Sequence, residues 1–224
     1  HHLRVPSFKE PWFSSALYRL LARQGVDGGF GYYDGVHVDP WLSTHVMRVL
    51  RQAQLRGISI DESLMDRGNA YLQRVVGSSE HPWSTQLFAL DALAADGKAT
   101  EDSVERLVPS SLRPGASLDE RALSLHVLAS TRRHADEKHK LALGLLNALV
   151  AHADGLQVSE SGPDAPDAPD SQGATLASRA RTQALVLRAL TAVWKNPFDY
   201  DSSKLPLNAD VLSRTARGLL AMRE

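Results

Sequence analysis

The chain has 224 residues, of which 43% are hydrophobic and 23% are charged, as in an ordinary globular protein with a sizeable core. Its net charge of −1 gives no electrostatic reason to expect a nucleic-acid or anionic-membrane partner, and no apolar run approaches the roughly 20 residues of a membrane-spanning helix. The absence of cysteine excludes disulfides, thiolate metal sites, a cysteine nucleophile and a thioester within these residues.

Hydrophobic residues recur at three- and four-residue spacing along most of the chain, which is the pattern of amphipathic helices. Prolines open two of the predicted helices, at a first-turn position where proline is tolerated. Asp61, Thr100 and Ser117 are predicted N-caps, the last in a capping box with Glu120, and Gly57 is predicted to end a helix. The predicted helices span residues 11–24, 40–55, about 61–75, 83–95, 100–107, 117–131, 136–152, 174–195 and 207–223.

The predicted helices differ in how much of their surface is apolar. Those at 117–131 and 174–195 are apolar around more than half their circumference, whereas the last one has a narrow apolar stripe. Wide-faced helices that alternate with narrow-faced ones, at about 40 residues per pair, indicate two concentric helix layers. The predicted fold is therefore all-α, an α/α arrangement that is a toroid if it closes and a solenoid if it does not. No segment shows a sustained period-two pattern, so any strands are short.

The chain is predicted to be a single domain over residues 1–224. One stretch, 159–173, interrupts the helical pattern with repeated prolines and acidic residues. This composition provides too little apolar surface to offset the entropy that ordering the stretch would cost. We therefore expect a mobile loop within the domain at this point.

The most distinctive passage joins the first two predicted helices. Its closely spaced glycines allow backbone conformations that other residues avoid, and its aromatic side chains supply bulk that can anchor the loop. A glycine-rich phosphate loop is a poor alternative, because no strand precedes the passage and no Lys-Ser/Thr follows it. We predict a structural turn without a catalytic, cofactor-binding or metal-binding role. Its residues are Asp27, Gly28, Gly29, Phe30 and Gly31, followed by Pro40, Trp41 and Leu42.

In this passage the chain resembles the thioester domain of bacterial alpha-2-macroglobulins, which are relatives of the complement thioester proteins. In that family a helix ending in Gln, then DGGFG or a similar run, then DPWL and a further helix recur in this order. The resemblance continues more faintly through residues 122–125, 181–190 and 217–223. It implies an α/α toroid, the helical repeat of terpenoid cyclases and protein prenyltransferases, which this chain forms in whole or in part.

The resemblance also implies a function. The chain would be a non-catalytic domain of a protease inhibitor that traps its target protease after cleavage of a bait region elsewhere in the parent protein. Such a parent is expected in the periplasm or at the cell envelope. The expected partners are neighbouring domains of the parent chain and, through the parent, a protease; no cofactor, nucleic acid or membrane insertion is expected.

Two features of the family are missing from the sequence. The Cys-x-x-Gln thioester motif is absent, and residues 108–116 contain no histidine of the kind that steers thioester reactivity in complement-type members. Either the sequence begins after the thioester motif, or the parent belongs to a thioester-free branch of the family. The sequence leaves both alternatives open.

A metal site is one alternative to this interpretation. Asp34, His37, Asp39 and His45 lie close together in sequence and carry imidazole and carboxylate ligands. However, no second ligand pair has the tight helical spacing that metal sites favour. We therefore expect roles in the turn and at the helix start, with His45 on a half-buried face.

A glycan-processing hydrolase or lyase on the same scaffold is the main rival function, with paired carboxylates drawn from Asp27, Asp34 and Asp39. We expect instead that Asp27 bonds its own turn and that Asp39 complements a helix N-terminus. A terpene cyclase would need a DxDD motif and a protein prenyltransferase a cysteine-containing zinc site, and the sequence has neither. A pure interaction solenoid is the third class.

Two further groups of polar residues are expected to be solvated rather than functional. A basic segment is balanced by neighbouring acidic residues and is interpreted as a helix junction; it comprises Arg132, Arg133, His134, Lys138, His139 and Lys140. The hydroxyl residues lack the sequence context of a catalytic nucleophile and are expected on helix surfaces; they are Ser14, Ser15, Ser43, Thr44 and Ser178.

Overall fold

The computed structural model of the chain describes residues 11–33, 37–113, 115–159, 179–196 and 205–222. Over these residues the protein is mainly α-helical, as predicted, with one two-stranded sheet. The elements are α1 (Pro11–Leu21), α2 (Pro40–Leu55), α3 (Glu62–Gly77), α4 (Trp83–Ala95), α5 (Glu101–Leu107), the 3-10 helix η1 (Val108–Leu112), α6 (Leu118–Ala129), α7 (Ala135–Asn147), β1 (Leu149–His152), β2 (Gly155–Val158), α8 (Arg179–Lys195) and α9 (Ala209–Ala221).

The helix ends follow the local signals in the sequence. The side chains of Asp61 and Thr100 accept hydrogen bonds from backbone N–H groups in the first turns of α3 and α5. Ser117 and Glu120 form the predicted capping box at the start of α6. Gly57 and Gly97, which follow α2 and α4, have φ angles of +84° and +67°, which favour glycine.

The helix predicted over 136–152 is wrong in its last third. Helix α7 ends at Asn147 and is soon followed by β1, which pairs antiparallel with β2. The turn between the strands is residues 153–154, and Gly155, the first residue of β2, has a φ angle of +142°. Asp154-Gly155 is a hairpin signal, and tertiary packing overrides the helical pattern before it. The packing is close, because a Cβ atom at Gly218 of α9 would lie 2.2 Å from the Leu156 carbonyl oxygen of β2.

A buried glutamine holds the hairpin against two helices. Gln183 of α8 is fully buried, and its Nε2 donates to the carbonyl oxygens of Leu156 and Thr215 at 2.8 and 3.0 Å. Its Oε1 accepts a hydrogen bond from the Val158 N–H at 2.8 Å. Gln183 thereby joins β2, α8 and α9, and its buried amide is satisfied by hydrogen bonds to backbone groups within the fold.

Two predictions extend into residues that the structure does not describe. The predicted helix 174–195 is observed from Arg179 onward, and its first residues lie outside the described ranges. The predicted mobile loop 159–173 also lies outside them, apart from Ser159, whose backbone N–H donates to the Ala148 carbonyl oxygen at 2.9 Å.

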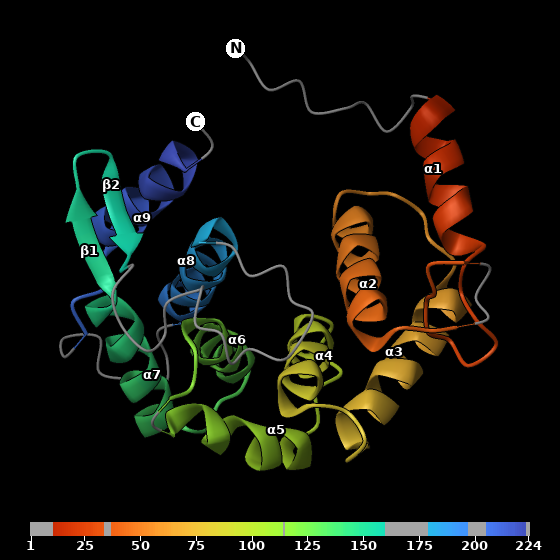
Figure 1. Cartoon of the computed structure of the whole chain (residues 1–224), viewed down its shortest axis with the longest axis horizontal. Coiled ribbons are helices and arrows are strands. Elements are labelled where there is room, and N and C mark those ends of the chain that lie inside the picture. Colours follow the sequence, from red (N-terminus) through yellow and green to blue (C-terminus); the bar gives the residue numbers. More distant parts are fainter. Residues whose placement is uncertain (1–10, 34–36, 114, 160–178, 197–204, 223–224) are drawn as a thin grey trace.

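The helices form two layers along an arc, as the alternation of wide and narrow apolar faces predicts. Figure 1 shows α2, α4, α6 and α8 along the inner side of the arc and α3, α5, α7 and α9 along the outer side. Each inner helix contacts the next one, and α3, α7 and α9 contact α4, α6 and α8 respectively. The arc is open between α1 and α9 in Figure 1, so closure into a toroid stays a prediction.

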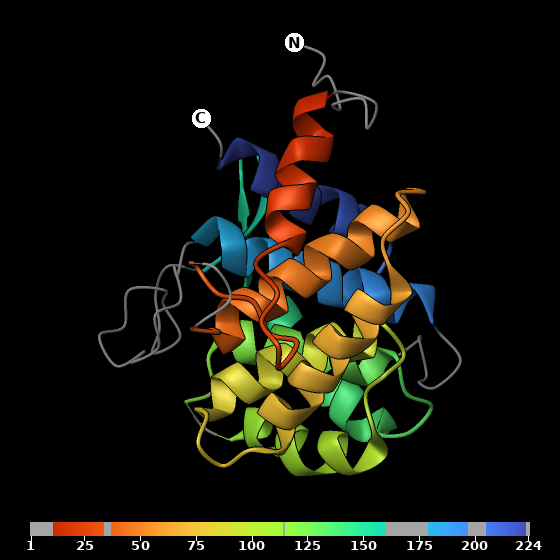
Figure 2. The ribbon, with the colours of Figure 1, turned by 90° about the vertical axis from the view of Figure 1, so that its right-hand side faces the viewer.

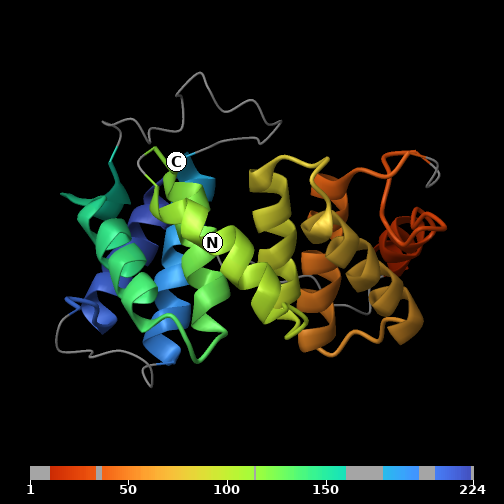
Figure 3. The ribbon, with the colours of Figure 1, turned by 90° about the horizontal axis from the view of Figure 1, so that it is seen from below.

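The other two views show how the ends of the arc differ. In Figure 2 helix α1 projects beyond the two layers. In Figure 3 the helices α2 to α4 lie at one side and α6 to α9 at the other, with α5 crossing between the two groups. None of the described helices combines the length and the apolarity that crossing a membrane requires.

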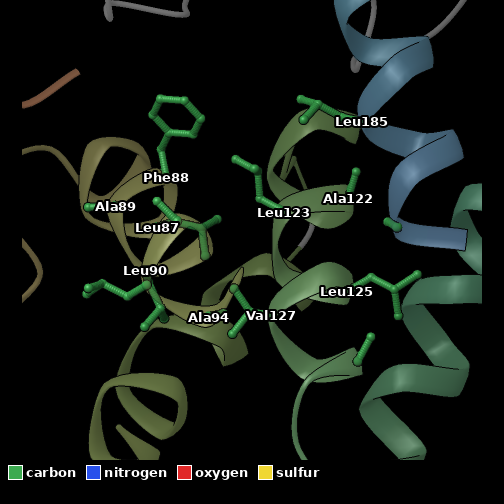
Figure 4. Packing of buried hydrophobic residues seen from close by; sticks show 14 of the residues in the cluster. Leu87, Phe88, Ala89, Leu90, Ala94, Ala122, Leu123, Leu125, Val127 and Leu185 are labelled. Atoms are coloured by element: carbon green, nitrogen blue, oxygen red, sulfur yellow. The ribbon is translucent and has the colours of Figure 1, made fainter. Parts of the chain in front are cut away.

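The core lies between the inner helices and on both sides of α6. Figure 4 shows Leu87 of α4 and Leu123 of α6 in the space between their helices, with Leu125 on the opposite side of α6. All three side chains are buried. The wide apolar face predicted for this helix is therefore confirmed, because α6 packs against α4 on one side and against α7 and α8 on others.

Candidate functional site

The turn at residues 27–31 contacts its own backbone and α3. The Asp27 Oδ1 atom accepts a hydrogen bond from the Gly29 N–H at 3.1 Å, as the sequence predicts for a turn aspartate. Gly28 has a φ angle of +92°, and a Cβ atom there would lie 2.2 Å from the Arg67 carbonyl oxygen. Gly29 lies against Tyr71, whose ring carbons would be 2.8 Å from a Cβ atom. Glycine is therefore required by backbone conformation and by space.

The residues that follow the turn lock it to the start of α2. Phe30 is 1% exposed, and its N–H donates to the Ser43 Oγ at 2.7 Å while its carbonyl oxygen accepts from the Asp39 N–H at 2.9 Å. Asp39 caps α2 by accepting a hydrogen bond from the Leu42 N–H at 2.6 Å. Ser43 and Thr44 are fully buried, so their expected place on the helix surface is wrong. The Ser43 hydroxyl is needed inside the turn.

The rest of the predicted motif carries the turn toward the inner layer. Gly31 is buried and bridges Val38 in an antiparallel arrangement, and Pro40 occupies the first helical position of α2. The Trp41 ring lies edge-on to His45, with ring centroids 4.1 Å apart, and 6.4 Å from the Phe88 ring of α4. The structure thus brings the motif residues together where α2, α3 and α4 meet.

A glutamine just after α1 completes this junction. The Gln24 Nε2 donates to the carbonyl oxygens of Gly28 and Leu64, both at 3.0 Å, and its Oε1 accepts from Arg67 at 2.8 Å. One side chain therefore connects the turn to α3. The family pattern of Gln before the glycines marks this residue, although α1 ends at Leu21 and Gln24 lies in the turn itself.

The four metal-ligand candidates are not assembled in the described part of the chain. Asp34 lies outside the described residues, and His37 is exposed. Asp39 is engaged as the cap of α2, and the His45 ring packs between the rings of Trp41 and Phe88. Two of the carboxylates considered for glycan chemistry are also engaged, since Asp27 and Asp39 both accept backbone hydrogen bonds as predicted.

A buried carboxylate surrounded by basic side chains was not predicted from the sequence. Asp91 of α4 is 0% exposed, and one Arg188 nitrogen of α8 lies 2.6 Å from each of its carboxylate oxygens. His126 Nδ1 of α6 lies 2.8 Å from Asp91 Oδ1, and Arg48 of α2 lies 3.6 Å from Oδ2. We call these four residues the Asp91 cluster. It draws one residue from each inner helix.

The Asp91 cluster keeps its carboxylate ionised. Burial alone would raise the pKa of Asp91, but Arg188, together with His126 and Arg48, outweighs burial and lowers the pKa from 3.8 to about 2. The pKa of Arg48 is shifted as well. Burial, Arg188 and Arg181 together lower the pKa of Arg48 from 12.5 to about 10, although Asp91 opposes this shift. A carboxyl group held in this way cannot deliver a proton near neutral pH.

His45 stands beside this cluster and is held neutral. Burial, followed by the charges of Arg48 and Arg181, lowers the pKa of His45 from 6.5 to about 4. Arg181 itself forms an ion pair with Asp119 at 3.1 Å. Arg48, Arg181 and Arg188 therefore lie close enough to affect one another electrostatically. Asp119 and Asp91 are paired with Arg181 and Arg188 respectively.

A single charged residue inside a largely apolar helix was the available sequence signal for the Asp91 cluster. Helix α4 has nine buried residues in succession from Gln86 to Ala94, and Asp91 is the one charged residue among them. Its partners could not be identified because Arg188 is 97 positions away along the chain. Lys138 is a second residue placed differently from expectation: it is 3% exposed, and its Nζ donates to the Thr131 carbonyl oxygen at 2.7 Å.

The turn geometry predicts an unequal cost for two similar substitutions. Gly28→Ala adds a methyl group that would meet the Arg67 carbonyl oxygen, whereas Gly57→Ala, also at positive φ, adds one in open space. Both variants bear backbone strain, but Gly28→Ala also displaces α3. Urea unfolding should show Gly28→Ala to be less stable than Gly57→Ala by about 1–3 kcal/mol. Equal losses of stability in the two variants would contradict the close approach of Gly28 to the Arg67 carbonyl oxygen. If Gly28→Ala kept its stability but no longer bound a ligand that the unmodified chain binds, the turn would be a binding site.

Acidification should remove stability in two separate pH ranges. The folded state holds the pKa of His45 below its unfolded value, so its contribution is present above pH 6.5 and is lost as the pH falls from 6.5 to about 4. The pKa of Asp91 is also lowered, so its contribution, about 2 kcal/mol, is present above pH 3.8 and is lost between pH 3.8 and about 2. Urea unfolding measured from pH 8 to pH 2 would show both losses.

Single variants separate the two ranges. His45→Gln should flatten the loss of stability between pH 6.5 and 4 and leave the lower range unchanged. Asp91→Asn should lower stability at neutral pH, since it leaves the cations of its cluster without their buried counterion, and should flatten the range below pH 4. A pH profile that kept its shape in both variants would contradict these assignments.

Comparison with known proteins gives matches by structure alone. No protein-family model matches the chain, and no curated protein matches its sequence. Salmonella alpha-2-macroglobulin reacted with methylamine is 19% identical, with a TM-score of 0.61 over 95% of this chain and 13% of that chain. Trypsin-activated alpha-2-macroglobulin from Escherichia coli is 19% identical, with a TM-score of 0.63 over 93% and 13%. Native Escherichia coli alpha-2-macroglobulin, spanning domain MG7 to the C-terminus, is 18% identical, with a TM-score of 0.62 over 93% and 30%.

These matches confirm the resemblance to bacterial alpha-2-macroglobulins that the turn motif indicates. The chain spans between 13% and 30% of the lengths of these three proteins, so it corresponds to one part of each. Identities of 18–19% establish a shared fold and leave the function to be argued from the site. The chain has the fold of a helical segment of the bacterial alpha-2-macroglobulins.

Proposed function

We propose that this chain is a non-catalytic domain of a bacterial alpha-2-macroglobulin-like protease inhibitor, equivalent to the family's thioester domain. The observation that carries the proposal is the match of 93–95% of the chain to one segment of several alpha-2-macroglobulin structures. The turn motif supports it independently, because DGGFG and DPWL stand in the family's order at the junction of α2, α3 and α4.

The use of charge in the interior supports a non-catalytic role. A glycoside hydrolase needs a carboxylic acid with a raised pKa and a second carboxylate across the scissile bond. The pKa of Asp91 is lowered instead, and its neighbours are the guanidinium groups of Arg48 and Arg188 and the imidazole of His126, which belong to three other helices. Asp27 and Asp39 spend their oxygens on backbone N–H groups of the turn and of α2. The polar groups of these described sites thus serve the fold.

The parent protein would supply the inhibitory activity. Protease trapping requires a bait region and rearrangement of several domains, and a helical repeat of this size provides neither. A thioester in the parent would take its sulfur from outside these 224 residues, because they contain no cysteine. We place the parent in the periplasm or at the cell envelope, as the resemblance implies.

The partners of this domain would be its neighbours in the parent chain. Large hydrophobic side chains are exposed near both ends of the arc, among them Tyr18 at 75% on α1 and Leu220 at 59% on α9. Exposed apolar side chains at the ends of an open two-layer arc suit contacts with further helices or domains of the same protein. The target protease would contact the parent as a whole.

The isolated chain should therefore be inert in assays that the whole inhibitor would pass. We expect no inhibition of a panel of endopeptidases, no covalent adduct with methylamine by mass spectrometry, and no turnover of a panel of glycans. A full-length bacterial alpha-2-macroglobulin serves as the positive control for the first two assays. The physical reason is the absence of cysteine and of a bait region from the described arrangement.

Glycan turnover would reverse the proposal if it depended on the aspartates of the turn. Asp39→Asn keeps a good N-cap and Asp27→Asn keeps a turn-forming side chain, so both variants should fold. Loss of a measured glycan activity in either variant, with unchanged circular dichroism and melting temperature, would show that the chain is an enzyme.

A further inference from the structure

Helix α5 and the start of α7 bring three metal-ligand side chains together on the outer layer. Glu101 and Glu105 stand four residues apart on α5 and so share one face of that helix. His134 immediately precedes α7 and approaches them from the neighbouring element. One ligand atom from each residue lies within 4.8 Å of the other two. Among the described residues this is the group of three whose ligand atoms lie close enough together that they could hold one metal ion.

The imidazole of His134 is placed between carboxylates. Its Nε2 is buried, has no hydrogen-bond partner, and lies 3.9 Å from Glu101 Oε1. Its Nδ1 lies 4.0 Å from Glu137 Oε2, one turn into α7. A separation of 3.9 Å is too long for a hydrogen bond. Two ligands of one tetrahedral zinc ion, each bound at about 2.0 Å, are separated by about 3.3 Å. Small rotations of the Glu101 and Glu105 side chains, which are exposed, would close the difference.

The surroundings suit a partly solvated ion. A cavity of about 290 Å³ adjoins the group and has Glu101, Thr131 and Arg133 among its lining residues. It can hold water molecules that complete the coordination of a metal with three protein ligands. The Glu137 carboxylate lies 4.0 Å from the other imidazole nitrogen, on the side where a carboxylate commonly fixes the orientation of a metal-bound histidine.

Arg133 forms an ion pair with one of the two carboxylates of this group. Arg133 lies 3.1 Å from Glu101 Oε1, and its side chain is 69% exposed. A surface ion pair of this kind contributes little to stability, so a divalent ion can replace it at small cost. Arg133 is then a competitor of the metal and not part of its site.

We propose that Glu101, Glu105 and His134 form a binding site for a divalent transition-metal ion such as Zn²⁺, with Glu137 as a positioning residue for the imidazole. A mixed carboxylate and imidazole set favours zinc and related ions over Mg²⁺ and Ca²⁺, which prefer oxygen ligands alone. The proposal revises the sequence-based expectation of no metal site. It concerns residues far from the turn motif, so it stands or falls independently of the inhibitor proposal.

The test is a Zn²⁺ titration of the full 224-residue chain by isothermal calorimetry, with thermal unfolding as a second readout. All variants are made in a reference chain that carries His1→Ala and His2→Ala, because the two N-terminal imidazoles can bind zinc on their own. We expect one Zn²⁺ per chain, a melting temperature that rises with zinc concentration, and no displacement by millimolar Mg²⁺. Absence of saturable binding, or displacement by Mg²⁺, would overturn the proposal.

Variants then assign the ligands. Glu105→Gln and His134→Asn should each weaken zinc binding by at least about tenfold. Asparagine is chosen because His134 has a φ angle of +65°, which asparagine tolerates. The matched controls Asp102→Asn on α5 and His139→Asn on α7 should bind zinc as tightly as the reference chain does. Equal affinity in all variants, or equal weakening in the controls, would place the ion elsewhere and contradict the site.

Two further variants test the roles of the flanking residues. Arg133→Ala should bind zinc more tightly than the reference chain, since the competing guanidinium is gone. Glu137→Ala should bind more weakly, and Glu137→Gln, whose amide oxygen can accept a hydrogen bond from a metal-bound imidazole as a carboxylate would, should recover much of the affinity. Weaker binding in Arg133→Ala, or no difference between the two Glu137 variants, would contradict these roles.

Discussion

A single buried carboxylate fixes the relative positions of the inner helices. Asp91 has no contact with solvent, and moving an ionised carboxylate out of water costs several kcal/mol unless its charge is compensated. The compensation comes from Arg48, His126 and Arg188, which belong to three different helices. Because the two guanidinium groups and the imidazole come from three different helices, Asp91 has all of its partners only when α2, α6 and α8 lie around α4 as observed. The interaction therefore specifies one arrangement of the layer, while apolar burial supplies most of the stability.

The same constraint bears on function. Polar groups in the interior of an enzyme are left poised for a substrate, whereas Asp91 and the aspartates of the turn are committed to partners within the chain. Large hydrophobic side chains are exposed near both ends of the arc, among them Tyr18 on α1 and Leu220 on α9. This distribution agrees with the proposed role of a domain that packs against other domains of a larger protein.

Local chemistry determined what could be predicted from the sequence. Helix starts at Asp61, Thr100 and Ser117 depend on side chains within three residues of the cap, and all three were predicted correctly. The β1–β2 hairpin was missed because it depends on α9, with Gly218 allowing the close approach.

Long-range contacts account for most of the remaining surprises. The burial of Ser43 depends on the turn thirteen residues earlier, and the partner of Asp91 in α8 is 97 positions away. The group of Glu101, Glu105 and His134 was hidden for the same reason, since its members meet only when α5 and α7 are in place. The turn motif could be recognised in advance because its sequence, a glycine-rich run followed by DPWL, is contiguous.

The central claim is that Asp91 and its cations act as one unit that holds the inner helices together. A double-mutant cycle with Asp91→Asn and Arg188→Met, measured by urea unfolding at neutral pH, tests it most directly. If the two residues form one unit, the double variant should be no less stable than Asp91→Asn alone, because removing the carboxylate has already left Arg188 without its counterion. If the two losses of stability add within about 0.5 kcal/mol, the residues act independently and Asp91 does not organise the inner layer.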